Sequence, residues 1–329
     1  SKHLAHALLS PLPKQNRSYP QEGLPASVII VDMTIILVVT GAKGGNVVFV
    51  SDTLRAYSLD EAVRLARAEK FDNVYAVNGK NGAYLRTRPR VPKKEELEQL
   101  AVSPRQVSVV AAGLRNPPST PPALNRYLQL YADSLREKGG PFITIGGKTA
   151  ILKQAAKEQL HFHRRLIFEA VEKFTIDPYL LGAIIIDEIA RFIPFEDIFE
   201  KLTAFFVNKN ASGGIAQVKV ETARGLIRAG YYNPELRDFK LSPTNVAKTS
   251  RAHLYGYVQD PKHSIFFAAA QMRALTNRWE RFVDLRTRPE IIATLYHLPS
   301  KPPHSSPQPN ERGLQIANEF YRLAKIWLQ

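Results

Sequence analysis

The stretch "DPYLLGAIIIDEIARF" (residues 177–192) predicts a buried helix that ends close to a pair of acidic side chains. A proline occupies its first turn, where the missing backbone N–H breaks no hydrogen bond. Because the following residues are apolar on every side, we expect the helix to be buried up to Ile186. Asp187 and Glu188 come next, so one of the two acids must lie near the core or at the floor of a cleft.

The chain around this stretch carries a mainly helical pattern from residue 121 to its end. Amphipathic segments with few strand signals lie at 121–138, 150–174, 264–282 and 310–328. The second of these segments is long enough for one helix or two. We therefore expect residues 121–329 to form a mainly α-helical domain with one core.

Residues 26–91 differ from this half, because β-branched runs there predict a small ββαββ unit. The predicted elements are two strands within 27–41 and 46–51, a helix over 58–70, and a hairpin over 73–89 around "NGKNG". Ser58 and Glu61 have capping-box spacing at the start of the helix. The end of the unit, "GKNGAYLRTRP" (79–89), resembles a small uncharacterised domain common in bacterial proteins, which implies no known chemistry.

The remaining segments are expected to flank or connect these two domains. Residues 1–25 are rich in Pro, Ser, Gln and Lys without periodicity, which predicts a flexible tail. Residues 92–120 mix charges with prolines and are expected to form a linker with one short helix. The predicted fold class is therefore a two-domain α+β protein.

The composition favours a polyanionic partner and excludes cysteine chemistry. The formal net charge is +15 and the isoelectric point about 9.9, which suits nucleic acid, an anionic membrane or the bacterial cell wall. Without cysteine there is no disulfide, thiolate metal site or cysteine nucleophile. The most apolar segment (27–39) is interrupted by Asp32 and is shorter than the ~20 residues of a membrane span. We expect neither a membrane span nor a secretion signal.

Glu188 has two interpretations from spacing alone. A carboxyl group removed from water has a raised pKa and can hold a proton at neutral pH, as a general acid must. The alternative is a structural ion pair with Arg191, which lies one turn later on the helix. Spacing alone favours the ion pair, because helical carboxylates are usually solvated or paired.

The stretch "ASGGIAQVKVETARGL" (211–226) shifts this balance toward catalysis. It resembles the turn of lysozyme-like lytic transglycosylases in the goose-type lysozyme superfamily, which reads Ser-x-x-Gly-x-x-Gly-Leu-Met-Gln before a Thr-Ala helix. The matching residues are Ser212, Gly214, Ile215, Ala216, Gln217, Thr222 and Ala223. Three further segments follow the family's order: "AVEKFTIDPYLLGAIIIDE" (170–188), "DPKHSIFFAAAQMRAL" (260–275) and "IIATLYHLP" (291–299). Four elements in the right order are a more specific signal than one motif.

The resemblance implies a lysozyme-like catalytic domain over 121–329 and a role for each matched residue. Glu188 would be the general acid and base that cleaves the bond between N-acetylmuramic acid and N-acetylglucosamine, and Tyr296 would bond near Glu188 or the N-acetyl group. The residues expected to bind the glycan are Ser212, Gly214, Ile215, Gln217 and His297. A lytic enzyme needs no second carboxylate, whereas for a hydrolytic one the candidates are Asp187, Asp197, Glu200 and Glu221. No metal or cofactor is implied.

The chain also departs from the family pattern, which makes it a remote member. Ile189 stands where the family has a serine after the catalytic glutamate, and His297 and Ser264 each replace an asparagine. The segment 192–211 is expected to be a loop that is longer and more hydrophobic than in the family.

Several candidates also have a purely structural interpretation. Tyr296 would be a core aromatic residue with a bonded hydroxyl, and Gln217 a cap for the helix after it. Glu221 is interpreted as a first-turn helix charge. His161 and His163 are interpreted as structural, because on a helix they face different sides.

The leading functional prediction is a peptidoglycan-degrading lytic transglycosylase or muramidase. We expect a secreted antibacterial effector delivered to a target periplasm or envelope, with glycan strands and an immunity or secretion-adaptor protein as partners. An ordinary exported wall-remodelling enzyme is the alternative within this class. In a different class, the chain would be a basic, non-enzymatic protein that binds nucleic acid or cell wall. No helix-turn-helix or aromatic–basic RNA-binding pattern supports nucleic acid.

Overall fold

The computed structural model describes residues 33–42, 44–111, 120–207, 212–298 and 302–329, without the side chains of 204–207. It shows a mixed α/β fold with small sheets and many helices, which confirms the α+β class at this level. Residues Asp32–Gln329 form one compact unit. The domain boundaries expected from the sequence stay predictions, and the tail predicted at 1–25 lies outside the described residues.

A four-stranded sheet with the strand order β3-β2-β1-β6 forms the main β structure of the described chain. Its strands are β1 (Ile35–Thr40), β2 (Asn46–Ser51), β3 (Ala56–Ser58) and β6 (Ala101–Val102). β1 and β2 pair antiparallel with Val38 opposite Phe49, whereas β6 runs parallel to β1. The strands β4 (Val74–Gly79) and β5 (Gly82–Thr87) form a separate hairpin at the predicted place.

Two strands of the main sheet are absent from the predicted ββαββ pattern. β3 and β6 contain three and two residues, too few to show an alternating pattern in the sequence. β6 lies in the segment expected to be a linker, which also contains η1 (Lys93–Glu95), α2 (Leu97–Leu100) and α3 (Pro104–Ala111). This segment is therefore ordered as far as Ala111, and residues 112–119 lie outside the described residues.

Most of the main helices are confirmed where the sequence predicted them. They are α1 (Leu59–Arg67), α4 (Pro122–Lys138), α5 (Lys153–Phe162), α6 (Arg164–Phe174), α7 (Pro178–Phe192), α9 (Val220–Arg228), α11 (Pro261–Trp279), α13 (Glu311–Gln315) and α14 (Tyr321–Trp327). Two further helices, α10 (Arg251–Gln259) and α12 (Pro289–His297), were not predicted. The segment 150–174 is two helices that meet at His163. α13 and α14 are joined by a π-helix, η6 (Ile316–Phe320).

Short elements connect these helices. They are the hairpin strands β7 (Phe142–Ile145), β8 (Lys148–Leu152), β9 (Ser212–Gly213) and β10 (Val218–Lys219), and the 3-10 turns η3 (Phe239–Leu241), η4 (Val246–Lys248) and η5 (Leu285–Thr287). The predicted capping box is also confirmed, because Ser58 and Glu61 exchange side-chain and backbone hydrogen bonds at the start of α1.

The prediction of a loop at 192–211 is wrong, because most of this segment is helical. It contains η2 (Ile193–Phe195) and α8 (Glu196–Val207). Ile198 and Leu202 lie four residues apart and are fully buried in a hydrophobic cluster with residues of the four-stranded sheet. The hydrophobic residues of this segment are therefore the core-facing positions of an amphipathic helix.

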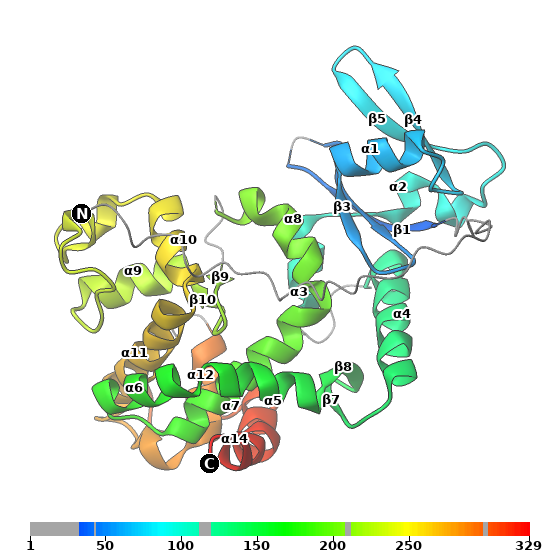
Figure 1. Ribbon diagram of the computed structural model, residues 1–329. Helices are drawn as coiled ribbons and strands as arrows, with labels where there is room; N and C mark the ends of the chain where they lie inside the picture. Colours follow the sequence, from blue (N-terminus) through cyan, green and yellow to red (C-terminus); the bar gives the residue numbers. More distant parts are fainter. Residues whose placement is uncertain (1–32, 43, 112–119, 208–211, 299–301) are drawn as a thin grey trace, which may run out of the picture. The chain divides into compact units, whose positions relative to one another are not determined.

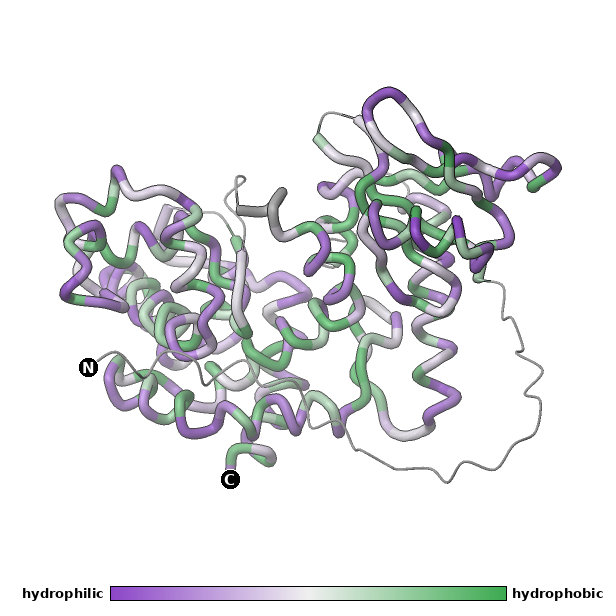
Figure 2. The backbone as a smooth tube through the Cα atoms, turned by 45° about the horizontal axis from the view of Figure 1, so that its top comes forward, coloured by the Kyte–Doolittle hydropathy of each residue, from purple (hydrophilic) through white to green (hydrophobic). Residues whose placement is uncertain are grey.

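Helix α7 lies in the C-terminal hydrophobic core, buried from Leu180 to Arg191. Asp177 caps its start by accepting hydrogen bonds from two backbone N–H groups of the first turn. Gly182 allows a close approach of α14, since a Cβ there would lie 2.8 Å from Leu328. Figure 1 shows α14 beside α7, and in Figure 2 hydrophobic and hydrophilic stretches alternate along many helices, as one-sided burial requires. This packing fixes the place of the acidic pair on α7.

Candidate active site

The acidic pair on α7 lies beside a cleft, and its two members face different surroundings. Asp187 and Glu188 have exposed fractions of 0% and 8%. A cleft of about 1450 Å³ has Glu188 in its lining, together with the turn 212–217 and residues of α8 and α12. Asp187 is not part of this lining. Glu188 is therefore the acid of the pair that a ligand in the cleft can reach.

Asp187 is held by two arginines. Its Oδ1 accepts a hydrogen bond of 2.9 Å from Nε of Arg191, and its Oδ2 accepts one of 2.7 Å from Nε of Arg312 on α13. Burial acts to raise the pKa of Asp187, but the charges of Arg312 and Arg191 outweigh it and hold the pKa below its ordinary value. Both oxygens are engaged in structural ion pairs, which disfavours Asp187 as a second catalytic carboxylate.

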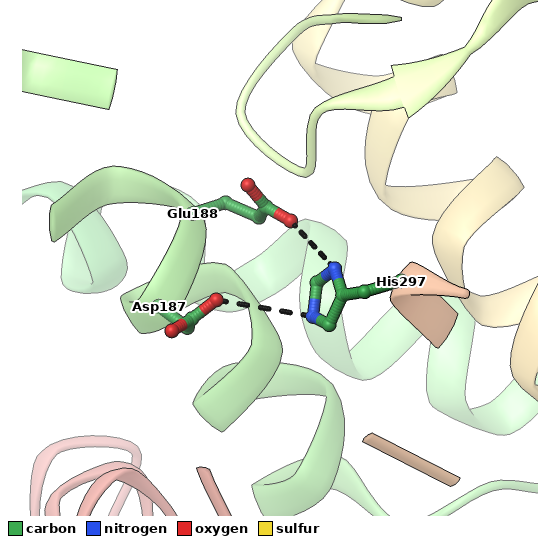
Figure 3. A group of neighbouring side chains, drawn as sticks. All are labelled: Asp187, Glu188 and His297. Carbon is green, nitrogen blue, oxygen red and sulfur yellow. Dashed lines mark ion pairs between the residues drawn. The ribbon is translucent and has the colours of Figure 1, made fainter. Parts of the chain in front are cut away.

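Glu188 has one bonded oxygen and one open oxygen. Its Oε1 lies 2.9 Å from Nη2 of Arg312 and 3.2 Å from Nδ1 of His297. Among the described residues no group donates a hydrogen bond to Oε2, and Figure 3 shows one oxygen of Glu188 directed at the imidazole and the other away from it. The expected pair with Arg191 is not observed, because Arg191 bonds to Asp187 instead. Glu188 therefore offers the cleft a carboxyl oxygen without a protein partner.

His297, the last residue of α12, completes the group. Its Nε2 lies 3.8 Å from Oδ2 of Asp187 and is buried without a hydrogen-bond partner. Burial lowers the pKa of His297, and the charge of Arg312 adds to this effect, so the imidazole is neutral at pH 7. Although His297 also lines the cleft, its Nδ1 faces Glu188.

The three side chains offer metal ligands, but their surroundings do not fit a cation. One ligand atom from each of Asp187, Glu188 and His297 lies within 4.8 Å of the others. The guanidinium of Arg312 already bridges both carboxylates, and Arg191 adds a second positive charge. A divalent ion would have to displace a guanidinium and would leave excess positive charge in a buried place. We therefore describe the group as an ion-pair network.

The turn at residues 212–217 lines the cleft and is closed by its own side chains. Gln217 donates from Nε2 to the carbonyl oxygen of Gly214 at 3.0 Å, and its Oε1 accepts from the Ser212 hydroxyl at 3.0 Å. Gly214 and Gln217 both have positive φ angles, 67° and 45°, so these bonds stabilise a backbone form that is rare outside glycine. Gln217 does not cap α9, whose N-cap residue Lys219 makes no side-chain bond.

Two residues from distant helices hold this turn in place. Ser264 on α11 accepts a hydrogen bond from the N–H of Ala216 at 3.1 Å, and Tyr296 on α12 donates to the carbonyl oxygen of Ala216 at 3.0 Å. Burial raises the pKa of Tyr296 well above its ordinary value, and the charge of Glu188 raises it further. Tyr296 is thus a buried aromatic residue near Glu188 whose hydroxyl bonds to the turn.

The other candidate carboxylates differ in how they are engaged. Glu221 lies in the first turn of α9 and pairs with Arg224 and Arg251 at 2.9 Å each, as its structural interpretation predicted. Glu200 on α8 lines the cleft, whereas Asp197 does not. Of the four candidates, Glu200 is the one that lines the cleft without belonging to an ion pair in the described chain.

Two charged residues of the site were missed by the sequence reasoning. Glu196 lines the same cleft; partial burial and the charges of Asp197 and Glu200 raise the pKa of this otherwise exposed side chain. Its spacing of four residues from Glu200 is a usable signal only once α8 is known to be a helix. Arg312 is separated from Glu188 by 124 residues, a distance that no local pattern spans.

The last candidates are the residues expected to bind the glycan and the two histidines near the start of α6. The residues expected to bind the glycan all line the cleft: Ser212, Gly214, Ile215, Gln217 and His297. His161 is exposed and His163 is buried, so the prediction that they face different sides is confirmed.

No family model, curated protein or solved structure matches this chain. Within the described ranges, we find no helix with the length and apolar character of a membrane span. The functional interpretation therefore rests on the geometry of the site and on the resemblance of its segments.

Proposed function

We propose that the chain is a peptidoglycan-degrading glycosidase that cleaves the β-1,4 bond between N-acetylmuramic acid and N-acetylglucosamine. The observation that carries this proposal is Glu188, a largely buried carboxyl group that lines a cleft and whose Oε2 receives no hydrogen bond from the described residues. The cleft volume of about 1450 Å³ exceeds the ~300–1,000 Å³ typical of small-ligand pockets. A polymeric glycan requires such a site.

Glu188 would act first as an acid and then as a base. It gives its proton to the glycosidic oxygen as the bond to C1 breaks, through a transition state with oxocarbenium character. In the lytic reaction the Glu188 carboxylate then removes the proton of the 6-hydroxyl of the same sugar while that oxygen bonds to C1. In the hydrolytic reaction a water molecule attacks C1 with help from a second carboxylate.

The engagement of the other acids favours the lytic route. Asp187 and Glu221 are committed to ion pairs, and Asp197 is absent from the cleft lining. Glu200 and its neighbour Glu196 are the acids on α8 through which hydrolysis would have to proceed. The lytic reaction needs no carboxylate besides Glu188, so it is the reaction that we propose.

The turn 212–217 would form the wall against which the sugar lies. Because the Gln217 amide is bonded within the turn, we assign contact with the glycan to the backbone around Gly214 and to Ile215, both in the cleft lining. The ring of bonds to Ser264 and Tyr296 supports this assignment, since a wall must be rigid to orient a substrate.

We further propose a lysozyme-like catalytic domain over 121–329 and an accessory α+β domain over 26–91. Two separate hydrophobic clusters support this division, although α4 and α8 contribute to the cluster of the sheet. The net charge of +15 suits an anionic envelope. Delivery to a bacterial periplasm, with an immunity or secretion-adaptor partner, is part of the same proposal.

A peptidoglycan-clearing assay tests the role of Glu188. We expect wild-type protein to clear a suspension of purified sacculi and Glu188→Gln to lower the rate by about 10²–10⁴-fold, the usual contribution of acid–base catalysis. Glu221→Gln is the matched control, because it makes the same chemical change at another cleft-lining residue. Full activity of Glu188→Gln would refute the proposal.

Two further measurements separate the remaining possibilities. Mass spectrometry of the released fragments distinguishes 1,6-anhydro ends, which we expect, from the reducing ends that hydrolysis leaves. A gel-shift experiment with DNA fragments tests the alternative of a basic, non-enzymatic binder. Wild-type protein that leaves sacculi intact and retards DNA would favour that alternative.

A further inference from the structure

His297 has a geometry that substrate binding does not explain. Its side chain is 10% exposed, and Nδ1 lies 3.2 Å from Oε1 of Glu188. Its Nε2 is buried without a hydrogen-bond partner. An imidazole that served only to bind a ligand would direct a polar atom into the cleft rather than toward a carboxylate beside it.

We propose that His297 is a positioning residue for Glu188: its neutral imidazole donates from Nδ1 to Oε1 and, together with Arg312, confines the acid proton of Glu188 to Oε2. The catalytic consequence rests on the proposed function. The proposed hydrogen bond would be a property of the folded protein, so it is measurable without any activity.

The two oxygens of Glu188 have different surroundings. A carboxyl oxygen has two lone pairs in its plane; Oε1 accepts a hydrogen bond from Arg312 at 2.9 Å and lies 3.2 Å from Nδ1 of His297, which we propose is the second donor. With both lone pairs engaged, Oε1 has no place for a proton. The proton of the acid form must therefore be on Oε2, the oxygen without a partner, which is where a general acid needs it.

The direction of the bond follows from the surrounding charges. If Nδ1 carried the lone pair, it would face a carboxylate oxygen at 3.2 Å, which is repulsive, whereas an N–H at that place is attractive. The other nitrogen, Nε2, is farther from its nearest carboxylate, at 3.8 Å from Asp187. The hydrogen of the neutral ring therefore belongs on Nδ1, and the bare Nε2 is the atom found without a partner.

Three charged groups face the imidazole. They are Asp187 and Glu188 on α7 and Arg312 on α13. The other elements packed on α12 are α11, η5 and η6, and the largest charge effects on the imidazole come from the two carboxylates and Arg312. Arg312 keeps the ring neutral by repulsion while the two carboxylates fix the side on which its hydrogen lies.

The tautomer of His297 is the first test. Two-bond 1H–15N correlation spectra of the full-length protein at pH 7.5 should show the Nδ1–H form for His297, with the exposed His161 as the reference for an unconstrained ring. Glu188→Ala should shift His297 toward the Nε2–H form. An Nε2–H tautomer in the wild-type protein would overturn the proposal, whether or not the protein cleaves peptidoglycan.

A pair of amide substitutions is the second test. In His297→Asn the side-chain amide nitrogen falls near the place of Nδ1, whereas in His297→Gln it falls near the place of Nε2. We expect His297→Asn to keep kcat within about tenfold of wild type, and His297→Gln to lose about 10²-fold in kcat with KM little changed, as for a misplaced catalytic group.

The outcomes separate this inference from the proposed function. Equal losses in the two variants, with unchanged thermal unfolding, would mean that His297 only packs and would refute its positioning role. If neither variant nor wild type clears sacculi, the proposed function fails while the tautomer still decides the hydrogen bond.

Discussion

The floor and the wall of the cleft are built by different interactions. The floor, which we define as the cleft-lining residues Glu188, His297 and Arg312 with Asp187 behind them, is a largely buried ion-pair network. The wall, which we define as the turn 212–217 with Ser264 and Tyr296, is held by neutral hydrogen bonds to its backbone. Ion pairs fix the position of Glu188, whereas neutral hydrogen bonds fix the turn that we propose faces the glycan.

We expect the two regions to respond differently to substitutions. A buried ion pair adds little over a well-packed apolar replacement, but losing one partner leaves an uncompensated charge and costs several kcal/mol. A neutral hydrogen bond contributes about 1 kcal/mol, so its loss is graded. A single substitution in the floor should therefore cost more free energy of unfolding than a single substitution in the wall.

Asp187→Asn should have the largest effect. The change keeps the shape but leaves Arg191 and Arg312 with one carboxylate fewer, so we expect a loss of about 3–5 kcal/mol in the free energy of unfolding. Urea denaturation followed by circular dichroism measures it. Glu221→Gln is the control, because the side chain of Glu221 is 37% exposed in its ion pairs. It should lower the free energy of unfolding by about 0–1 kcal/mol. Similar losses in both variants would contradict the distinction between buried and exposed pairs.

Gly214→Ala should be the most damaging small change in the wall. Its Cβ would overlap the side chain of Ser264 and the carbonyl oxygen of Val258, and the φ angle of 67° adds strain. We expect a loss of about 1–3 kcal/mol by thermal or urea unfolding. Gly225→Ala, where a Cβ on α9 meets nothing within 4 Å, should instead be stabilising by about 0.5–1 kcal/mol. A neutral Gly214→Ala would show that the turn is not held against α11.

Ser264→Ala should have a smaller effect because it removes a neutral hydroxyl, which accepts from the N–H of Ala216 and donates to the carbonyl oxygen of Gly213. The buried N–H of Ala216 would lose its partner, which costs roughly 1–2 kcal/mol. Tyr296→Phe removes the donor to the carbonyl oxygen of Ala216, and the two changes should be non-additive in a double-mutant cycle because they hold the same residue. Strict additivity would mean that the two contacts act independently.

A change of pH just below neutrality should alter the free energy of unfolding less than any of these substitutions. The folded pKa of His163 and His297 lies below the ordinary value of about 6.5, so the unfolded chain binds more protons and stability falls as the pH drops below about 6.5. The pKa of Asp187 is also lowered in the fold; its contribution is complete above the unfolded pKa and is lost as the pH falls through the folded one. Urea midpoints at pH 7.5, 5.5 and 4 measure both; a rise in stability toward pH 5.5 would contradict the sign.

Much of the helical structure could be predicted from the sequence because its signals are local. The capping box at Ser58 and the apolar run of α7 each specify an element within a few residues. β6 and α8 were missed for physical reasons. A two-residue strand such as β6 is too short to show periodicity. In α8 one side is buried in the hydrophobic cluster of the sheet, and its hydrophobic residues were interpreted as part of an unusually hydrophobic loop.

The same division applies to the site. Glu188 could be singled out because a carboxylate that follows an apolar helix face must be buried or border a cleft. Arg312 could not be singled out, because 124 residues separate it from Glu188. Its local sequence does not distinguish it from an arginine on the protein surface. Gln217 was expected to bind the glycan and lines the cleft; that its amide is bonded within the turn, where Gly214 and Gln217 have positive φ angles, could not be predicted from the sequence.

The π-helix η6 (Ile316–Phe320) holds about one residue more in its turn than an α-helix does, so α13 and α14 keep nearly the rotational phase of one continuous α-helix. Deleting one residue from this segment and restoring regular α-geometry should therefore leave the orientation of α13 nearly unchanged. Each residue of an α-helix turns by ~100°, so a second deletion would turn α13 by about that angle and swing the Arg312 guanidinium away from both carboxylates. A side chain at Gly313 would overlap Thr294 on α12, so α13 fits in one orientation. The length of this helix is therefore as much a determinant of the site as the residues that touch Glu188.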